Sequence, residues 1–222
     1  MEFRHEWKIA ISHSDKIAIE QRLRAVAQTD SHAIDGKYHI RSLYFDNSAD
    51  KALWEKLDGV DRREKFRIRL YNHDPSMIHL EKKSKRSGLC SKESAELTAE
   101  EAQSIVDGCW DWMARSDRSL VRELYVKMRT QGLRPKTIVD YTREPFVYAP
   151  GNVRVTLDYG IRTGMGCTDF LNPDCVTVPA DSTVIMEVKW DEYLPDIIRD
   201  AVQLSGRRVA AFSKYAACRI YG

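Results

Sequence analysis

The 222-residue sequence has no apolar run near the roughly 18 residues that a membrane-spanning helix requires. Its first residues, Met1 to Glu6, also lack the apolar centre of a secretory signal peptide. The five cysteines are odd in number and include no C-x-x-C pair, which argues against a disulfide framework or a zinc site. These absences together predict a protein of the reducing cytoplasm.

A large excess of one charge sign is also absent, because 35 basic residues face 33 acidic ones and the net charge is only +2. The charge is nevertheless unevenly distributed. From Arg62 to Lys92 there are ten basic and three acidic residues, so this block carries +7 and the rest of the chain −5. With 43% hydrophobic residues and no internal repeat or linker, the sequence predicts one folded domain over residues 1–222.

Within this block, residues 65–70 alternate strictly between a cation and an apolar side chain. That is the period of a β-strand, so Lys65, Arg67 and Arg69 are expected on one face and Phe66 and Ile68 on the other. Neighbours on one strand face lie only about 6–7 Å apart, where like charges repel unless water or anions separate them. On one strand alone, this pattern indicates only a solvated surface.

The same alternation recurs in four further segments, each with an apolar face and a face of mixed cations and carboxylates. These segments are centred on Glu6-Trp7-Lys8, Glu81-Lys82-Lys83, Arg154-Val155-Thr156 and Glu187-Val188-Lys189. The outer faces of a β-sandwich are usually richer in Ser and Thr, so a barrel with charged side chains inside and apolar faces under covering helices is favoured. Charges in such a lumen need partners, which predicts a highly charged ligand.

The remaining pattern indicates an α+β fold with about eight strands and inserted helices. Helices are expected at 14–27 with Ser14 as N-cap, 49–57, 98–106, 119–129 and 195–204; strands at 38–45, 65–71, 77–85, 136–143, 153–159 and 183–190; a glycine-rich connection at 160–166; and either a helix or a short strand at 211–220.

Eight short motifs, in order, resemble those of the VTC (vacuolar transporter chaperone) domain, the polyphosphate polymerase branch of the triphosphate tunnel metalloenzymes (CYTH-like superfamily). They are Glu6-Trp7-Lys8, Ser42-Leu43-Tyr44-Phe45-Asp46, Arg67-Ile68-Arg69, Glu81-Lys82-Lys83, Tyr141-Thr142-Arg143, Arg154-Val155-Thr156-Leu157-Asp158, Glu187-Val188-Lys189 and Ser213-Lys214-Tyr215. The resemblance implies an eight-stranded antiparallel β-barrel, the triphosphate tunnel, with covering helices.

The resemblance also implies an activity, in which the terminal phosphoryl group of ATP is transferred to a polyphosphate chain with the help of Mn²⁺ or Mg²⁺. Glu187 would be the metal ligand, and Lys189, Lys214, Arg67 and Arg69 the catalytic cations. The phosphate-binding residues would be Lys8, Arg67, Arg69, Lys83, Lys92, Arg143, Arg154, Lys189, Ser213 and Lys214.

The positions or roles of several charged residues are not fixed by the alternation alone. Lys65 fits a rim charge as well as a lumen ligand, whereas Lys82 and Lys85 are expected to be solvated. Arg143 shares parity with Val139 and Tyr141, so alternation alone does not place it among the charges without a β-bulge. Glu6 and Glu81 are metal ligands or, as we favour, partners of neighbouring lysines.

The alternatives to a polymerase are a tunnel phosphatase that hydrolyses triphosphate or nucleoside triphosphates and a polyphosphate-binding module without turnover. A nucleic-acid ligand is not expected, because the cationic strands lack an aromatic stacking pattern. The sequence offers no membrane segment, so any coupling to transport would need a membrane partner protein.

Overall fold

A computed structural model describes residues 4–87, 89–206 and 212–219, and its core is one antiparallel sheet with the strand order β1-β10-β8-β7-β3-β4-β5-β6. These strands are β1 (His5–Ile11), β3 (Tyr38–Asp46), β4 (Arg63–Tyr71), β5 (Asp74–Arg86), β6 (Leu89–Leu97), β7 (Arg134–Tyr148), β8 (Val153–Thr163) and β10 (Val184–Trp190). Two short strands, β2 (Gln28–Thr29) and β9 (Val178–Asp181), pair with β7 and β8 outside this path. The α+β class and the eight antiparallel strands are confirmed.

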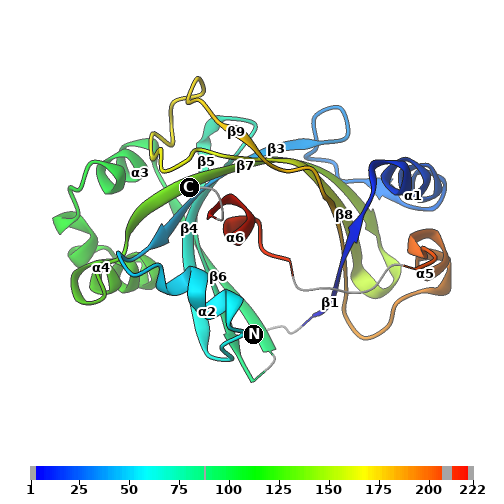
Figure 1. Cartoon of the computed structure of the whole chain (residues 1–222), viewed down its shortest axis with the longest axis horizontal. Coiled ribbons are helices and arrows are strands. Elements are labelled where there is room, and N and C mark those ends of the chain that lie inside the picture. Colours follow the sequence, from blue (N-terminus) through cyan, green and yellow to red (C-terminus); the bar gives the residue numbers. More distant parts are fainter. Residues whose placement is uncertain (1–3, 88, 207–211, 220–222) are drawn as a thin grey trace.

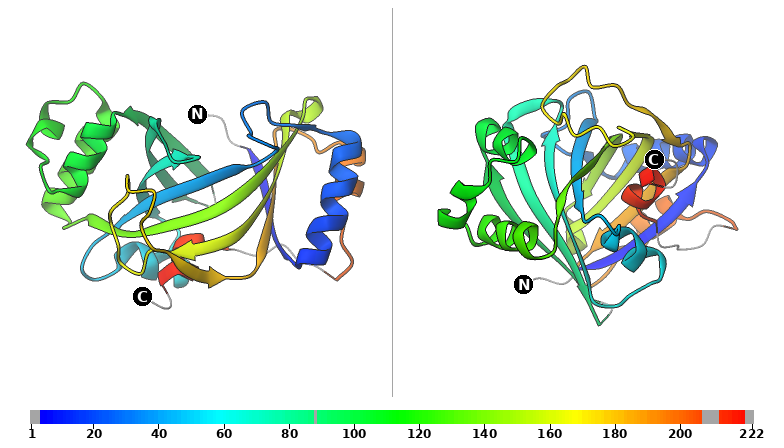
Figure 2. Two further views of the ribbon diagram at one scale, coloured as in Figure 1. Left: turned by 90° about the horizontal axis from the view of Figure 1, so that it is seen from above. Right: turned by 60° about the vertical axis from the view of Figure 1, so that its left-hand side comes forward.

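The sheet curls strongly, so that it has a concave and a convex face (Figures 1 and 2). Its end strands, β1 and β6, form no ladder with each other within the part of the chain that the structure describes. The sheet is therefore a half-barrel rather than a barrel closed by hydrogen bonds.

Helices cover the convex face in two groups (Figure 1). The described residues form helices α1 (His13–Val26), α2 (Lys51–Leu57), α3 (Ala99–Val106), α4 (Ser119–Thr130), α5 (Asp196–Val202) and α6 (Lys214–Arg219), with short 3₁₀ turns at Asp111–Arg115 and Pro150–Asn152. The two groups on the convex face are α3 with α4 and α1 with α5. Helices α3 and α4 pack on the apolar side of β4 and β5, where Phe66 and Ile68 are buried. Helices α1 and α5 cover the apolar side of β8 and β10, including Val155 and Val188. The apolar faces thus lie outside, under helices, as the alternation predicted.

The N-terminus of α1 differs from the expectation by two residues. Ser12, not Ser14, is the N-cap: its Oγ accepts a hydrogen bond from Asp15 N at 3.1 Å, and the Asp15 carboxylate accepts one from Ser12 N at 3.0 Å. This capping box needs an acidic or amide side chain three residues after the cap, which Ser12 has in Asp15 and Ser14 lacks. The analogous box predicted at Thr98 for α3 is confirmed.

Strand β8 is longer than expected, because the glycine-rich stretch after Tyr159 continues the strand to Thr163. Gly160 has φ +63°, and the register with β7 shifts there, so that one extra residue enters β8. This bulge reverses the alternation, and Ile161 consequently lies in the same concave-side cluster as Tyr141. The predicted connection at 160–166 was wrong in its first half.

Residues 211–220, left open between helix and strand, form helix α6 over Lys214–Arg219; positions 211 and 220 lie outside the described residues. In Figure 1, α6 sits within the concave side of the sheet. It is held there by Tyr215, whose ring stacks on Tyr44 at 5.0 Å between centroids and whose hydroxyl donates to Asp46 at 2.7 Å. Helix α6 therefore packs against the concave face of the sheet.

Candidate functional site

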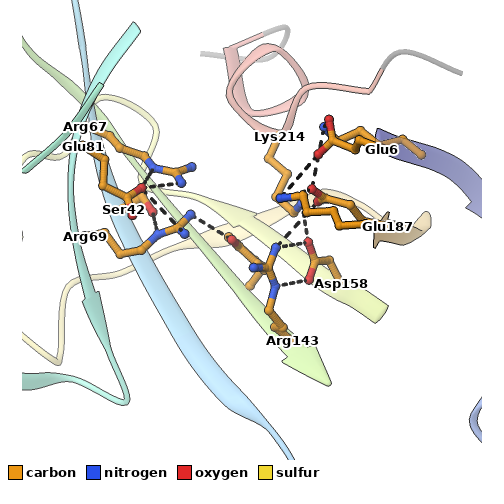
Figure 3. Close-up of polar contacts among 12 residues, drawn as sticks. Glu6, Ser42, Arg67, Arg69, Glu81, Arg143, Asp158, Glu187 and Lys214 are labelled. Carbon is orange, nitrogen blue, oxygen red and sulfur yellow. Dashed lines mark hydrogen bonds and ion pairs between the residues drawn. The ribbon is translucent and has the colours of Figure 1, made fainter. Parts of the chain in front are cut away.

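A first cluster of charges on the concave face comes from β4 and β5. Arg67 donates through Nε to Glu81 at 2.7 Å and through Nη1 to the Tyr44 hydroxyl at 2.8 Å. Arg69 donates to Ser42 Oγ at 3.1 Å and lies 3.9 Å from Glu81. Strand alternation places both arginines on this face, and the register sets Arg67 directly opposite Glu81. The two guanidinium groups are held by side chains from both neighbouring strands (Figure 3).

The electrostatic consequences of this cluster appear in two acidic groups. Burial opposes ionisation of Glu81, but Arg67 and Arg69 outweigh it and hold the pKa of this carboxyl far below its ordinary value. Burial likewise opposes ionisation of Tyr44, yet Arg67 and Lys65 lower the pKa of its phenol to about 8. The positive potential on this part of the face is therefore strong enough to stabilise anions.

A second cluster is built by cross-strand pairing of β1 with β10. The register sets Lys8 opposite Glu187 and Glu6 opposite Lys189. Lys189 Nζ lies 2.7 Å from Glu187 and 3.5 Å from Glu6, and Lys8 Nζ lies 2.8 Å from Glu6 and 3.9 Å from Glu187. Burial opposes ionisation of Glu187. A hydrogen bond with Glu6 and the positive charges of Lys189, Lys8 and Arg143 outweigh burial and lower the pKa of its carboxyl well below normal.

Asp158 on β8 joins this second cluster to α6. Arg143 donates two hydrogen bonds of 2.7 Å to its carboxylate, and Lys214 Nζ lies 2.6 Å from Oδ2. Asp158 is fully buried, and although burial opposes ionisation, Arg143 and Lys214 lower the pKa of the carboxyl to about 2. One carboxylate thus positions an arginine of the sheet and a lysine of the helix.

Tyr141 links the two clusters, which face each other in Figure 3. Its hydroxyl accepts a hydrogen bond from Arg69 Nη2 at 2.9 Å. Its ring lies beneath Lys214 Nζ at 4.6 Å and Arg143 Cζ at 5.6 Å from the centroid. Three cations from β4, β7 and α6 therefore converge around one aromatic ring.

Lys83 and Lys92 also lie on this concave face. Lys83 has no carboxylate within 4 Å among the described residues, and burial together with Lys189 and Arg67 lowers the pKa of its amine well below normal. Lys92, half exposed, contacts Glu81. Lys83 is thus a half-buried lysine with no acidic partner within 4 Å among these residues, so its charged form would be stabilised by a bound anion.

Arg154 and Ser213 lie at the edges of the site. Arg154 is opposite Lys189 in register, but its side chain reaches Asp30 at 3.0 Å and is 39% exposed. Ser213 accepts a hydrogen bond from Lys65 Nζ at 3.4 Å. Lys65 therefore extends from β4 toward Ser213, and whether it is a rim charge or a ligand in the interior stays open.

Two sequence-based expectations need correction. Arg143 requires no bulge in β7, because Val139 and Tyr141 themselves face the concave side, where α6 covers them. Lys82 does lie on the opposite face from Lys83, but it is ion-paired with Glu123 at 2.7 Å rather than solvated.

The sequence reasoning missed the neutral partners that hold the arginines. These are Ser42, Tyr44 and Tyr141, and their positions on alternating strand faces were the available signal. It also gave no role to Asp158, although this residue ends the alternating stretch that contains Arg154.

The carboxylates of this site fit a metal ion that takes few protein ligands. Among the described residues there is no group of three or more His, Cys, Asp or Glu side chains that could enclose one. Glu187 and Glu6 both contact Lys8 and Lys189, so two carboxylates meet at one point. Mg²⁺ commonly binds through one or two carboxylates and substrate phosphates, so this pair fits an ion that arrives with a phosphate ligand.

An eight-stranded antiparallel half-barrel with a cationic concave face defines a protein of the triphosphate-tunnel fold. The chain belongs to the VTC domain family, whose model matches residues 3–220. Proteins of this tunnel metalloenzyme-like class generally use divalent metal ions. No match was found among curated proteins. None of the helices in the described ranges is long and apolar enough to cross a membrane.

Three solved structures are similar to this chain at low sequence identity, and the first of them reaches a TM-score of 0.50. A Bacillus halodurans protein described as a candidate adenylate cyclase is 14% identical, with a TM-score of 0.50 over 85% of this chain and 80% of its own. A Vibrio parahaemolyticus protein of the same description is 10% identical, with a TM-score of 0.47 over 90% and 82%. The PH1819 protein of Pyrococcus horikoshii is 15% identical, with a TM-score of 0.42 over 89% and 84%.

Proposed function

We propose that this protein is a metal-dependent polyphosphate polymerase that transfers the terminal phosphoryl group of ATP to a polyphosphate chain. The observation that supports this most is the convergence of Arg69, Arg143 and Lys214 around Tyr141. Arg67 lies beside Arg69 at Glu81, and Lys189 contacts Glu187, which is 3.9 Å from Arg143. Such a set of cations, drawn from several strands and a helix, suits a ligand with several adjacent phosphates.

The residue types fit the chemistry of phosphoryl transfer. Negative charge in the transition state is spread over the equatorial oxygens, so positioning and electrostatic stabilisation supply most of the catalysis. Arg67 and Arg69 can each bind phosphate oxygens through a planar fork, whereas Lys189 and Lys214 act as point charges. The hydrogen bonds from Arg69 to Ser42 and Tyr141, and from Arg67 to Tyr44, orient the forks before a ligand binds.

Transfer to polyphosphate is favoured over hydrolysis by the state of the carboxylates. In the described part of the site, Glu6, Glu81, Asp158 and Glu187 each contact at least one cation. The neighbouring cations lower the pKa of Glu81, Asp158 and Glu187, which makes these carboxylates weak general bases toward water. The terminal oxygen of a polyphosphate chain is already anionic and needs no such base.

Glu187, with Glu6 beside it, would hold the metal ion. A divalent cation held by these carboxylates would offset negative charge on the phosphates. Within this chain, Lys8 and Lys189 keep both carboxylates close together, and the low pKa of Glu187 keeps it ionised as a ligand. Mn²⁺ and Mg²⁺ are the candidates that this pair of oxygen donors favours.

A triphosphatase is the second candidate, because the Glu6–Glu187 pair would also position a metal ion beside water. Incubation with ATP and Mn²⁺ distinguishes the two activities by product length on a gel. Long polyphosphate is the expected product, and release of orthophosphate alone would refute polymerisation.

The variant Glu187→Gln separates both enzymes from a binding module. Turnover should be lost while salt-sensitive binding of tripolyphosphate persists. The matched control is Glu93→Gln, which removes a carboxylate that pairs with Lys82 on the convex face. If wild-type protein binds tripolyphosphate tightly yet shows no turnover with either metal, the module is the correct reading. ATP and polyphosphate as partners, and the cytoplasm as the location, remain part of this proposal.

A further inference from the structure

The inner side chains of β4, β5 and β6 form rows across the three strands, because the ladders bring one residue of each strand into register. One row is Arg67, Glu81 and Ser94. The next row toward the β5–β6 turn is Lys65, Lys83 and Lys92, and the row after that is Arg63, Lys85 and Cys90. Two consecutive rows thus hold five cations and no carboxylate.

These rows have few acidic neighbours. Within the described residues, Lys65, Lys83 and Lys85 make no ion pair within 4 Å, and Lys92 pairs only with Glu81 of the preceding row. Arg63 donates to the carbonyl of Val60 at 2.5 Å. Like charges placed directly opposite each other on neighbouring strands are destabilising.

Burial and the neighbouring charges of Arg63, Lys8 and Lys85 lower the pKa of Lys56 on helix α2. In contrast to the two rows, Asp158 and Glu187 pair with Arg143, Lys214 and Lys189 elsewhere on the concave face. The carboxylates of this face are therefore unevenly distributed among its cations.

We propose that Arg63, Lys65 and Lys85 form an additional phosphate-binding stretch for the part of a linear condensed phosphate that extends beyond a triphosphate unit. The inference rests on the proposed function in one respect, that the concave face binds condensed phosphates. It adds a preference for long chains and names the residues responsible. A triphosphate held by Arg67, Arg69 and Lys214 leaves this stretch without an anion, whereas a longer chain supplies one.

An inorganic chain fits the stretch better than a nucleic acid. Binding of single strands combines cations with aromatic side chains on which bases stack. The two carboxylate-free rows contain no aromatic residue. Closely spaced lysines and an arginine on one strand face instead match a ligand whose charges follow one another without intervening bases.

The test compares the affinities of tripolyphosphate and of a long linear polyphosphate for wild-type protein and for the double variant Lys65→Met/Lys85→Met. Methionine keeps most of the apolar stem of lysine and removes the charge. The control is Lys82→Met/Lys127→Met, which removes two lysines that pair with Glu123 and Glu64 away from the concave face. Thermal melting and tripolyphosphate binding establish that each variant is folded.

We expect the Kd of the long chain to rise at least about tenfold in the double variant, while that of tripolyphosphate changes by less than about threefold. The slope of log affinity against log salt for the long chain should fall by about two, one for each lost phosphate contact. The control variant should retain both affinities.

Equal losses for both ligands, or no loss for the long chain, would overturn the inference. So would single-stranded RNA that competes as well as polyphosphate does. Failure of the proposed function is recognised separately, because wild-type protein would then bind neither phosphate ligand, or Arg67→Ala would leave both affinities unchanged.

Discussion

Lys214 of α6 and Arg143 of β7 share a single carboxylate, that of Asp158, at 2.6 and 2.7 Å. The carboxylate is fully buried, so its charge is compensated by these two cations rather than by water. The same contact joins the short helix on the concave side to the sheet. Asp158 therefore supports both the docking of α6 and the placement of two cations that we assign to phosphate binding.

Asp158→Asn should be strongly destabilising, because it leaves two buried cations without their partner. Removing one member of a buried ion pair costs about 3–5 kcal/mol, so the free energy of unfolding in urea should fall by that order. Glu93→Gln, which removes a half-exposed carboxylate from Lys82, should change it by about 1 kcal/mol or less. Equal effects of the two substitutions would show that Asp158 is not a structural centre of the site.

The effect of Asp158→Asn on the free energy of unfolding should depend on pH. The pKa of Asp158 is lowered to about 2 in the fold, against about 3.9 in an unfolded chain. A lowered pKa contributes stability that is complete above the unfolded value and is lost as pH falls through the folded one. The difference in unfolding free energy between wild type and Asp158→Asn should therefore be constant above about pH 5 and shrink toward about pH 2. A difference independent of pH would contradict this.

Anion binding should weaken as pH rises from about 7 to about 9, because Lys65 then loses its proton. Burial, opposed by Tyr44 and reinforced by Arg67, Lys56 and Lys8, lowers the pKa of Lys65 to about 8. The phenol of Tyr44, whose pKa is also about 8, adds negative charge over the same range. Long-chain polyphosphate affinity, measured by titration calorimetry across this range, reports both groups.

The two contributions can be separated by substitution. Lys65→Met should give weaker binding at neutral pH and a shallower decline, whereas Tyr44→Phe should retain the neutral affinity and lose the part of the decline due to the phenolate. A decline of the same steepness in wild type and in both variants would refute this assignment.

Tyr141→Phe tests the hydrogen bond to Arg69 without removing the aromatic ring under Lys214 and Arg143. Loss of one hydrogen bond of this kind corresponds to about 1 kcal/mol, or about a fivefold rise in the Kd of tripolyphosphate. Tyr193→Phe, at an exposed position, is the control and should have no effect. Unchanged affinity in Tyr141→Phe would mean that the hydroxyl does not orient Arg69.

Gly160→Ala should cost about 1 kcal/mol of unfolding free energy, because φ at this bulge is +63°. No atom lies within 4 Å of the added Cβ, so the cost is that of the backbone conformation alone. Gly160→Asn, which tolerates this conformation better than alanine does, should recover part of the loss. If alanine were neutral, the bulge would not require glycine.

Much of this site was predictable from strand alternation. Lys65, Arg67 and Arg69 share a face because side chains alternate with a period of two, and Phe66 and Ile68 are buried on the other face as expected. The expected bulge beside Arg143 was wrong because alternation identifies two faces but not which is inside, and apolar Val139 and Tyr141 are inside here, under α6.

Other features could not be derived from local pattern. The Gly160 bulge depends on pairing with β7, which is not a local property of the sequence. The ion pair of Arg154 with Asp30 likewise depends on a contact between distant segments of the chain. The docking of α6 through Lys214 and Tyr215 also requires the three-dimensional fold, since both partners, Asp158 and Asp46, lie far away in the chain.

The most direct test of the central claim is a crystal structure of the protein with Mn²⁺ and a non-hydrolysable ATP analogue. We predict that the phosphates lie on the concave face, with oxygens within hydrogen-bonding distance of Arg67, Arg69 and Lys214, and with the metal ion at Glu187. Phosphates bound on the convex face or at the edges of the sheet, with the pairs around Arg67 and Asp158 undisturbed, would contradict the account.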